Sequence, residues 1–101
     1  IINRGGEKIS PREVDEGIMD HPAIQQVVAF AVPHDKLGEQ VAAEAVLREG
    51  MEATPQEIRE FAAGQLADFK VPKEILILEE IPKGPTGKLQ RIGLAEKLGL
   101  A

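Results

Sequence analysis

The sequence predicts an α+β fold: a small, mostly antiparallel or mixed sheet with about three helices, in the order β-α-β-β-α-β-α. Three observations predict it. Helix-capping patterns occur twice, at Ser10-Pro11 and Thr54-Pro55. Between them, two apolar segments rich in β-branched residues, 24–32 and 41–47, follow one another with only a polar loop at 33–40, which favours an antiparallel pair. Proline and glycine mark the remaining turns.

The N-terminal segment is predicted to be a strand stub at residues 1–2 and a turn at 3–6, where paired glycines supply positive φ at no steric cost. The first helix then begins at Ser10, with Glu13 completing a capping box. It ends near His21-Pro22, because the residue before a proline is pushed out of the α region.

The second half of the chain repeats the pattern. Thr54 opens a helix whose apolar residues recur at helical spacing: Ile58, Phe61, Ala62 and Leu66. After a break at Val71-Pro72 we expect a short strand over 74–78. A loop rich in proline and glycine follows at 81–88, and the last helix is an amphipathic one over 89–98.

Composition excludes several classes of protein. The 101 residues carry a net charge of −5, no Cys and three Phe. Without Cys there is no disulfide framework, zinc ribbon or thiolate nucleophile. No apolar run approaches the length of a membrane span, so none is expected. A net acidic chain with few aromatic residues lacks the basic or stacking surface of a nucleic-acid binder.

The charge is uneven along the chain. Residues 1–69 hold six basic and 13 acidic residues, whereas residues 70–101 hold six basic and four acidic ones. The basic residues of this tail suit either a solvated surface or a phosphate-bearing ligand. They are Lys70, Lys73, Lys83, Lys88, Arg91 and Lys97.

One motif is the loop from Pro82 to Arg91, in which two prolines and two glycines precede Lys88. It is not a nucleotide-binding P-loop, because Pro82 stands where that motif needs glycine and Leu89 where it needs a hydroxyl. Two interpretations stay open: a rigid connector with a solvated lysine, or a loop that presents Lys88 to a ligand.

A second motif is the segment Arg4-Gly5-Gly6-Glu7-Lys8. It suits either a plain hairpin turn or a backbone that a ligand approaches closely. His21 and His34 lack a partner at ligand spacing, so neither is expected to bind metal. Asp35 and Glu39 show no acid–base pattern.

Together the motifs resemble the C-terminal domain of the adenylate-forming superfamily, which includes acyl-CoA synthetases, peptide-synthetase adenylation domains and beetle luciferases. The first matching motif is Gly6-Glu7-Lys8-Ile9 followed by Pro11-x-Glu13-Val14-Asp15, and the last is Pro82-Lys83-x-x-Thr86-Gly87-Lys88-Leu89-Gln90-Arg91. Similar pieces lie between them: His21-Pro22 with Val27-Val28, Gly38-Glu39, and Phe69-Lys70-Val71-Pro72.

The resemblance is greatest to acyl-CoA synthetases, notably the oxalyl-CoA synthetase-like and medium/long-chain groups. It implies that residues 1–101 are a single mobile, lysine-bearing C-terminal domain that starts beside the interdomain hinge. Its partner is the large N-terminal adenylation domain, which this sequence lacks. We therefore expect the isolated chain to fold, to bind no cofactor stably and to be inactive.

The implied activity is that of a cytoplasmic acid–thiol ligase, which converts a carboxylate, ATP and CoA to acyl-CoA, AMP and pyrophosphate with Mg²⁺. The resemblance assigns the catalytic lysine to Lys88. It assigns CoA or pantetheine binding to Gly5, Gly6, Glu7 and Lys8, and no metal ligand to this domain. In that scheme the domain swings between the adenylation and thioester-forming steps.

The resemblance also implies a regulator, because Pro82 and Gly87-Lys88 fit the pattern of a lysine acetyltransferase substrate. Two alternatives remain open. The chain is then either the C-terminal part of a peptide-synthetase-type adenylation domain that serves a carrier protein, or a non-catalytic interaction module of the same fold.

Overall fold

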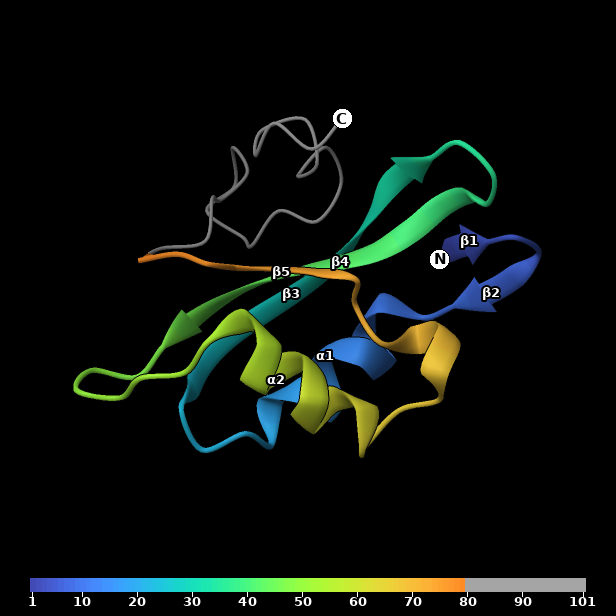
Figure 1. Cartoon of the computed structure of the whole chain (residues 1–101). Coiled ribbons are helices and arrows are strands. Elements are labelled where there is room, and N and C mark those ends of the chain that lie inside the picture. The colour runs from blue at the N-terminus through green and yellow to red at the C-terminus, as the bar shows by residue number, and fades with distance from the viewer. Residues whose placement is uncertain (80–101) are drawn as a thin grey trace.

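A computed structural model describes residues 1–79 of the chain (Figure 1). The α+β class is confirmed. The elements are β1 (Ile2–Arg4), β2 (Glu7–Ile9), α1 (Pro11–Met19), β3 (Ile24–His34), β4 (Gly38–Leu47), α2 (Pro55–Ala63), a 3-10 turn (Asp68–Lys70) and β5 (Glu74–Ile77). The predicted loop at 81–88 and helix at 89–98 lie outside the described residues.

The sheet is built around the long β3–β4 pair, which is antiparallel as predicted and extends from Ile24↔Leu47 to His34↔Gly38, with one register shift between Ile24 and Gln26. The hairpin of β1 and β2 joins β4 through Arg4↔Gly38. On the same side of β4, β5 pairs in parallel from Ala42↔Glu74 onward. The sheet is therefore mixed, because only the last pairing is parallel.

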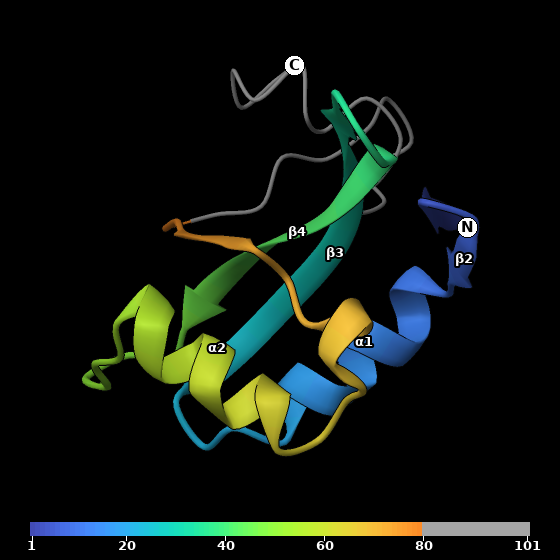
Figure 2. The ribbon, with the colours of Figure 1, turned by 45° about the vertical axis from the view of Figure 1, so that its right-hand side comes forward.

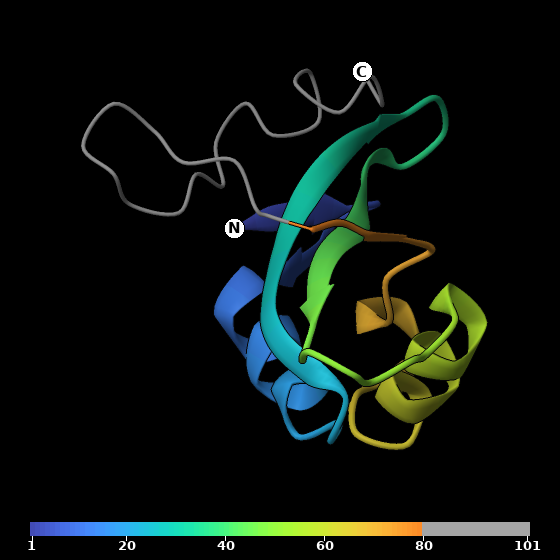
Figure 3. The same cartoon turned by 90° about the vertical axis from the view of Figure 1, so that its left-hand side faces the viewer.

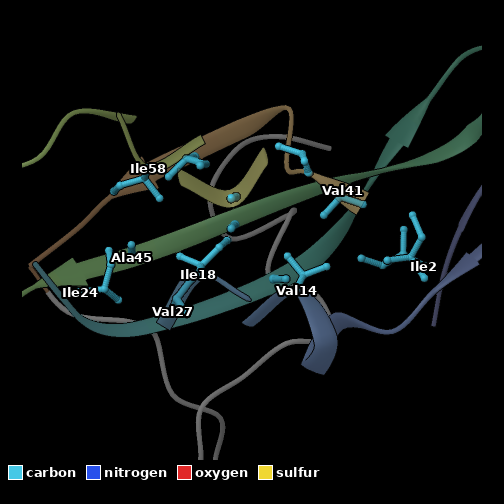
Figure 4. Close-up of a cluster of buried hydrophobic side chains, with 14 residues drawn as sticks. Ile2, Val14, Ile18, Ile24, Val27, Val41, Ala45 and Ile58 are labelled. Atoms are coloured by element: carbon cyan, nitrogen blue, oxygen red, sulfur yellow. The ribbon is translucent and has the colours of Figure 1, made fainter. Parts of the chain in front are cut away.

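Both helices lie on one side of this sheet (Figures 2 and 3). Their buried residues, Val14 and Ile18 from α1 and Ile58 and Ala62 from α2, meet the inward side chains of β3 and β4 in the main core (Figure 4). The hairpin adds Ile2 and Ile9, which pair with each other across β1 and β2. This core fixes the hairpin at the end of the sheet where β4 begins.

The predicted loop at 33–40 is wrong in its bounds. The antiparallel ladder runs on to His34 and resumes at Gly38, which leaves only residues 35–37 as the turn. The Nδ1 atom of His34 accepts the N–H groups of Lys36 and Leu37, at 3.2 and 3.0 Å. These bonds satisfy backbone donors within a tight turn, so the strands can pair to its edge.

Of the two predicted capping boxes, only the second forms. The Thr54 hydroxyl accepts the Glu57 N–H and the Glu57 carboxylate accepts the Thr54 N–H, both at 3.1 Å. At the start of α1 the Ser10 side chain makes no cap bond, and the carboxylate of Glu13 is paired with Lys70. Helix α2 also ends at Ala63, so the half-buried Leu66 packs against the core from beyond the helix and not from within it.

Candidate functional site

The β1–β2 turn is the part of the predicted site that the structure describes. Gly5 and Gly6 both have positive φ, +58° and +94°, which side chains with a Cβ rarely adopt. The turn places the two glycines at the tip of the hairpin, with Glu7 and Lys8 starting the returning strand. All four residues are exposed. The hairpin interpretation is thus confirmed, and it leaves the tip accessible to a ligand.

The tip is held by the turn between β3 and β4. The Gly5 N–H donates to the Leu37 carbonyl at 2.8 Å. The Asn3 N–H donates to the Glu39 carboxylate at 2.8 Å, and the Asn3 side-chain oxygen accepts the Gly6 N–H at 3.0 Å. The Glu39 side chain therefore orients the hairpin by accepting a hydrogen bond from the hairpin's backbone. Sequence analysis missed this role, because the bond joins residues 36 positions apart.

The two glycines differ in their surroundings. A Cβ on Gly5 would lie 2.9 Å from the Leu37 Cδ2 atom, the far end of a flexible side chain, so Leu37 would have to shift. A Cβ on Gly6 would meet no described atom within 4 Å. Packing within residues 1–79 therefore gives no reason to exclude a side chain at Gly6, although its φ favours glycine.

Of the six basic residues that sequence analysis grouped in the tail, the structure describes two, Lys70 and Lys73. The Lys70 Nζ forms an ion pair with Glu13 at 2.8 Å and lies 5.6 Å from the centre of the Phe69 ring. It joins the 3-10 turn to α1, so Lys70 is engaged within the fold and not presented to a phosphate. Lys88, the predicted catalytic residue, lies outside the described residues.

Neither histidine is placed as a metal ligand. The His21 Nδ1 accepts the Ala23 N–H at 3.1 Å, and its ring meets Phe61 edge-on at 5.0 Å. His34 closes the β3–β4 turn. Among residues 1–79, no three His, Cys, Asp or Glu side chains gather to hold a metal ion. No helix in this part of the chain is long and apolar enough to cross a membrane.

Glu44 is a polar residue that the sequence analysis did not single out. It lies in the middle of β4 with no exposed surface, and burial raises the pKa of its carboxyl to about 7. Neither carboxylate oxygen has a hydrogen-bond partner in the described part of the chain. The signal was available, because Glu44 is the one charged residue in the apolar run 41–47.

This fold and these motifs can be compared with known proteins. The family model of the AMP-binding enzyme C-terminal domain matches residues 13–88. The chain belongs to this family. The match begins within α1, continues through β3, β4, α2 and β5, and ends at Lys88, so it leaves out the hairpin.

Relatives of the chain include oxalate–CoA ligases. That of Arabidopsis thaliana is 48% identical over 90% of this chain and 18% of its own length, and that of Saccharomyces cerevisiae is 46% identical over 95% and 18%. Among solved structures, apo MatB from Rhodopseudomonas palustris superposes with a TM-score of 0.86 at 31% identity, covering 93% of this chain and 19% of MatB. The chain thus spans under a fifth of the length of these relatives.

Proposed function

We propose that residues 1–101 are the lysine-bearing C-terminal domain of an ATP-dependent acyl-CoA synthetase, attached in the whole protein to an N-terminal adenylation domain. The observation that carries the proposal is the identity of 46–48% to two oxalate–CoA ligases over at least 90% of the chain. The whole enzyme would form acyl-CoA, AMP and pyrophosphate from a carboxylate, Mg²⁺-bound ATP and CoA. Its proposed location is the cytoplasm.

In this proposal Lys88 is the catalytic residue of the first step. Attack of a carboxylate on the α-phosphate of ATP brings negative charges together, and a positioned ammonium group offsets that charge most in the transition state. The carboxylate oxygen forms the new bond to phosphorus while pyrophosphate leaves with the electrons of the broken bond. A long, flexible stem at the end of a loop suits a group that a moving domain delivers.

The hairpin tip serves the second step, in which the CoA thiol attacks the acyl carbonyl and AMP leaves. Gly5 and Gly6 would line the path of the pantetheine arm, with Glu7 and Lys8 beside it. The exposure of all four residues supports this role, as does the open space beyond Gly6. Lys8 is suited to the CoA phosphates because it is an exposed cation that follows Glu7 on β2.

CoA is a better acceptor for this proposal than a carrier protein, because the relatives named above are CoA ligases. The same observation favours an enzyme over an interaction module without activity. Acetylation of Lys88 would remove the charge that the first step needs, so a lysine acetyltransferase is a proposed regulator. Mass spectrometry of the Lys88 peptide after incubation with such an enzyme tests this.

The test of the function is an assay of the full-length protein with ATP, Mg²⁺ and a panel of carboxylic acids that includes oxalate. We expect AMP and pyrophosphate to form in step with an acyl-CoA thioester. Formation of a thioester only on a carrier protein, or no ATP cleavage with any acid, contradicts the proposal. The isolated 101-residue chain should show no ATP–pyrophosphate exchange.

A further inference from the structure

The hairpin of β1 and β2 has little backbone pairing with the rest of the sheet (Figure 1). Within residues 1–79, β1 pairs with β4 at one register position, Arg4↔Gly38. Ile2 and Ile9 anchor the hairpin in the core, but they lie at the end away from its tip. A two-stranded hairpin is marginally stable by itself. The position of the tip therefore depends on the contacts that the tip makes with the neighbouring turn and strand.

Two hydrogen bonds in series lead from β4 to Gly6. The Glu39 carboxylate accepts the Asn3 N–H at 2.8 Å, and the Asn3 side-chain oxygen accepts the Gly6 N–H at 3.0 Å. The first bond fixes the backbone of Asn3, and the second extends from the side chain of the same residue. An ionised acceptor makes a shorter and stronger hydrogen bond than a neutral one. The half-buried Glu39 thus sets the orientation of the exposed Gly6 through Asn3.

The other contacts of the hairpin with this region differ in kind. The Leu37 carbonyl accepts the Gly5 N–H at 2.8 Å, and because this bond joins two backbones it does not depend on the Leu37 side chain. The Arg4 Nε donates to the Gln40 Oε1 at 3.1 Å, which joins two side chains and leaves the tip backbone free. Glu39 is therefore the side chain through which β4 holds the backbone of the hairpin.

We propose that Glu39 is a positioning residue for thioester formation, which acts through Asn3 to hold the Gly6 backbone at the edge of the pantetheine path. This inference rests on the proposed function of the hairpin tip. Adenylate formation does not use the tip in that function, so only the thioester-forming step should depend on Glu39. A small misplacement of a group that lines the path of a reactant can lower the rate by an order of magnitude or more.

Asp35 provides a matched control for the charge of Glu39. It is an exposed acid in the turn between β3 and β4, four residues before Glu39. In the part of the chain that the structure describes, its carboxylate has no hydrogen bond or ion pair. Asp35→Ala therefore removes one negative charge from the same region without removing a contact to the hairpin.

The test measures the two half-reactions separately in the full-length enzyme. Glu39→Ala should slow thioester formation from supplied acyl-adenylate about tenfold or more, while adenylate formation stays within about twofold. Glu39→Gln should restore most of the rate, because its amide oxygen can accept the same N–H. Asp35→Ala should resemble the unaltered enzyme. Equal loss of both half-reactions, no loss, an equal loss in Asp35→Ala or failure of Glu39→Gln to restore the rate would each overturn the proposal.

The serial arrangement of the two bonds has its own test. Asn3→Ala keeps the N–H that Glu39 accepts but removes the bond to Gly6, so it should slow the same half-reaction. Because breaking either bond releases Gly6, Asn3→Ala combined with Glu39→Ala should be little slower than either single variant. Losses that multiply would show that the two residues act independently, and would overturn the action of Glu39 through Asn3.

Hydrogen exchange separates this inference from the proposed function, because it needs neither ATP nor CoA. In the full-length protein, Glu39→Ala should speed exchange at the amides of Asn3 and Gly6 about tenfold, read by mass spectrometry on the peptide of residues 2–9. Asp35→Ala should leave these rates unchanged. Unchanged exchange in Glu39→Ala overturns the positioning even in an active enzyme. Faster exchange in a protein that forms no thioester would instead confirm the contact and reject the proposed function.

Discussion

The Gly5 N–H donates to the Leu37 carbonyl at 2.8 Å, which fastens the tip of the β1–β2 hairpin to the turn between β3 and β4. The carboxylate of Glu39 strengthens the same junction by accepting the Asn3 N–H. A tip held in this way keeps Gly6 exposed at a fixed place on the sheet. Preorganisation of this kind favours a ligand that approaches the backbone closely.

This geometry leads to a prediction for the second half-reaction. In the full-length enzyme, Gly6→Leu should abolish thioester formation from supplied acyl-adenylate while leaving adenylate formation largely intact, because the new side chain would occupy the proposed pantetheine path. Gly50→Leu is the matched control, since Gly50 also has positive φ, +78°, and no described atom within 4 Å of a Cβ. Equal loss in both variants would attribute the effect to backbone strain and contradict the proposed path.

The complementary prediction concerns the first half-reaction. Lys88→Ala should lower the rate of adenylate formation by about 10²–10³, the usual cost of losing one preorganised group that stabilises transition-state charge. Conversion of supplied acyl-adenylate to the thioester should persist. Lys83→Ala, which removes a lysine from the same loop, should change neither rate appreciably. Loss of the same half-reaction in Lys88→Ala and Gly6→Leu would count against alternation of the domain between two steps.

The two helix N-termini yield a prediction about stability. Thr54→Ala should lower the free energy of unfolding by about 1 kcal/mol, because the Thr54 hydroxyl caps α2. Ser10→Ala should lower the free energy of unfolding by only a few tenths of this amount, since the Ser10 side chain makes no cap bond. Urea unfolding of the 101-residue chain measures both values. A loss at Ser10 equal to that at Thr54 would show that the cap of α1 forms in solution.

These two termini also show what sequence can predict. Both carry a hydroxyl residue, a proline and a glutamate in the same spacing, and that local pattern correctly predicts where each helix begins. It fails to predict the partner of the Glu13 carboxylate, which binds Lys70, a residue 57 positions away. Local signals therefore place the elements, whereas tertiary contacts decide which partners the polar side chains take.

The candidate site divides in the same way. The paired glycines predict a turn with positive φ, which the structure confirms. The contacts of Leu37 and Glu39 with the hairpin depend on how β1 meets β4, and no local pattern indicates them. Glu44 stands out in its apolar strand, but only the register of β3, β4 and β5 shows that it lies opposite the helices and between apolar neighbours.

Glu44 also makes stability depend on pH. Burial raises the pKa of its carboxyl from 4.5 to about 7, so between these values the folded state holds a proton that the unfolded state releases. Its contribution to stability is complete below about pH 4.5 and is lost as the pH rises to about 7.

We therefore expect the free energy of unfolding of the 101-residue chain to fall across this interval, by up to about 3 kcal/mol from Glu44. Glu44→Gln should remove this part of the fall, because an amide does not titrate. Urea unfolding at a series of pH values across the interval measures both slopes. An unchanged slope in Glu44→Gln would show that another group causes the fall.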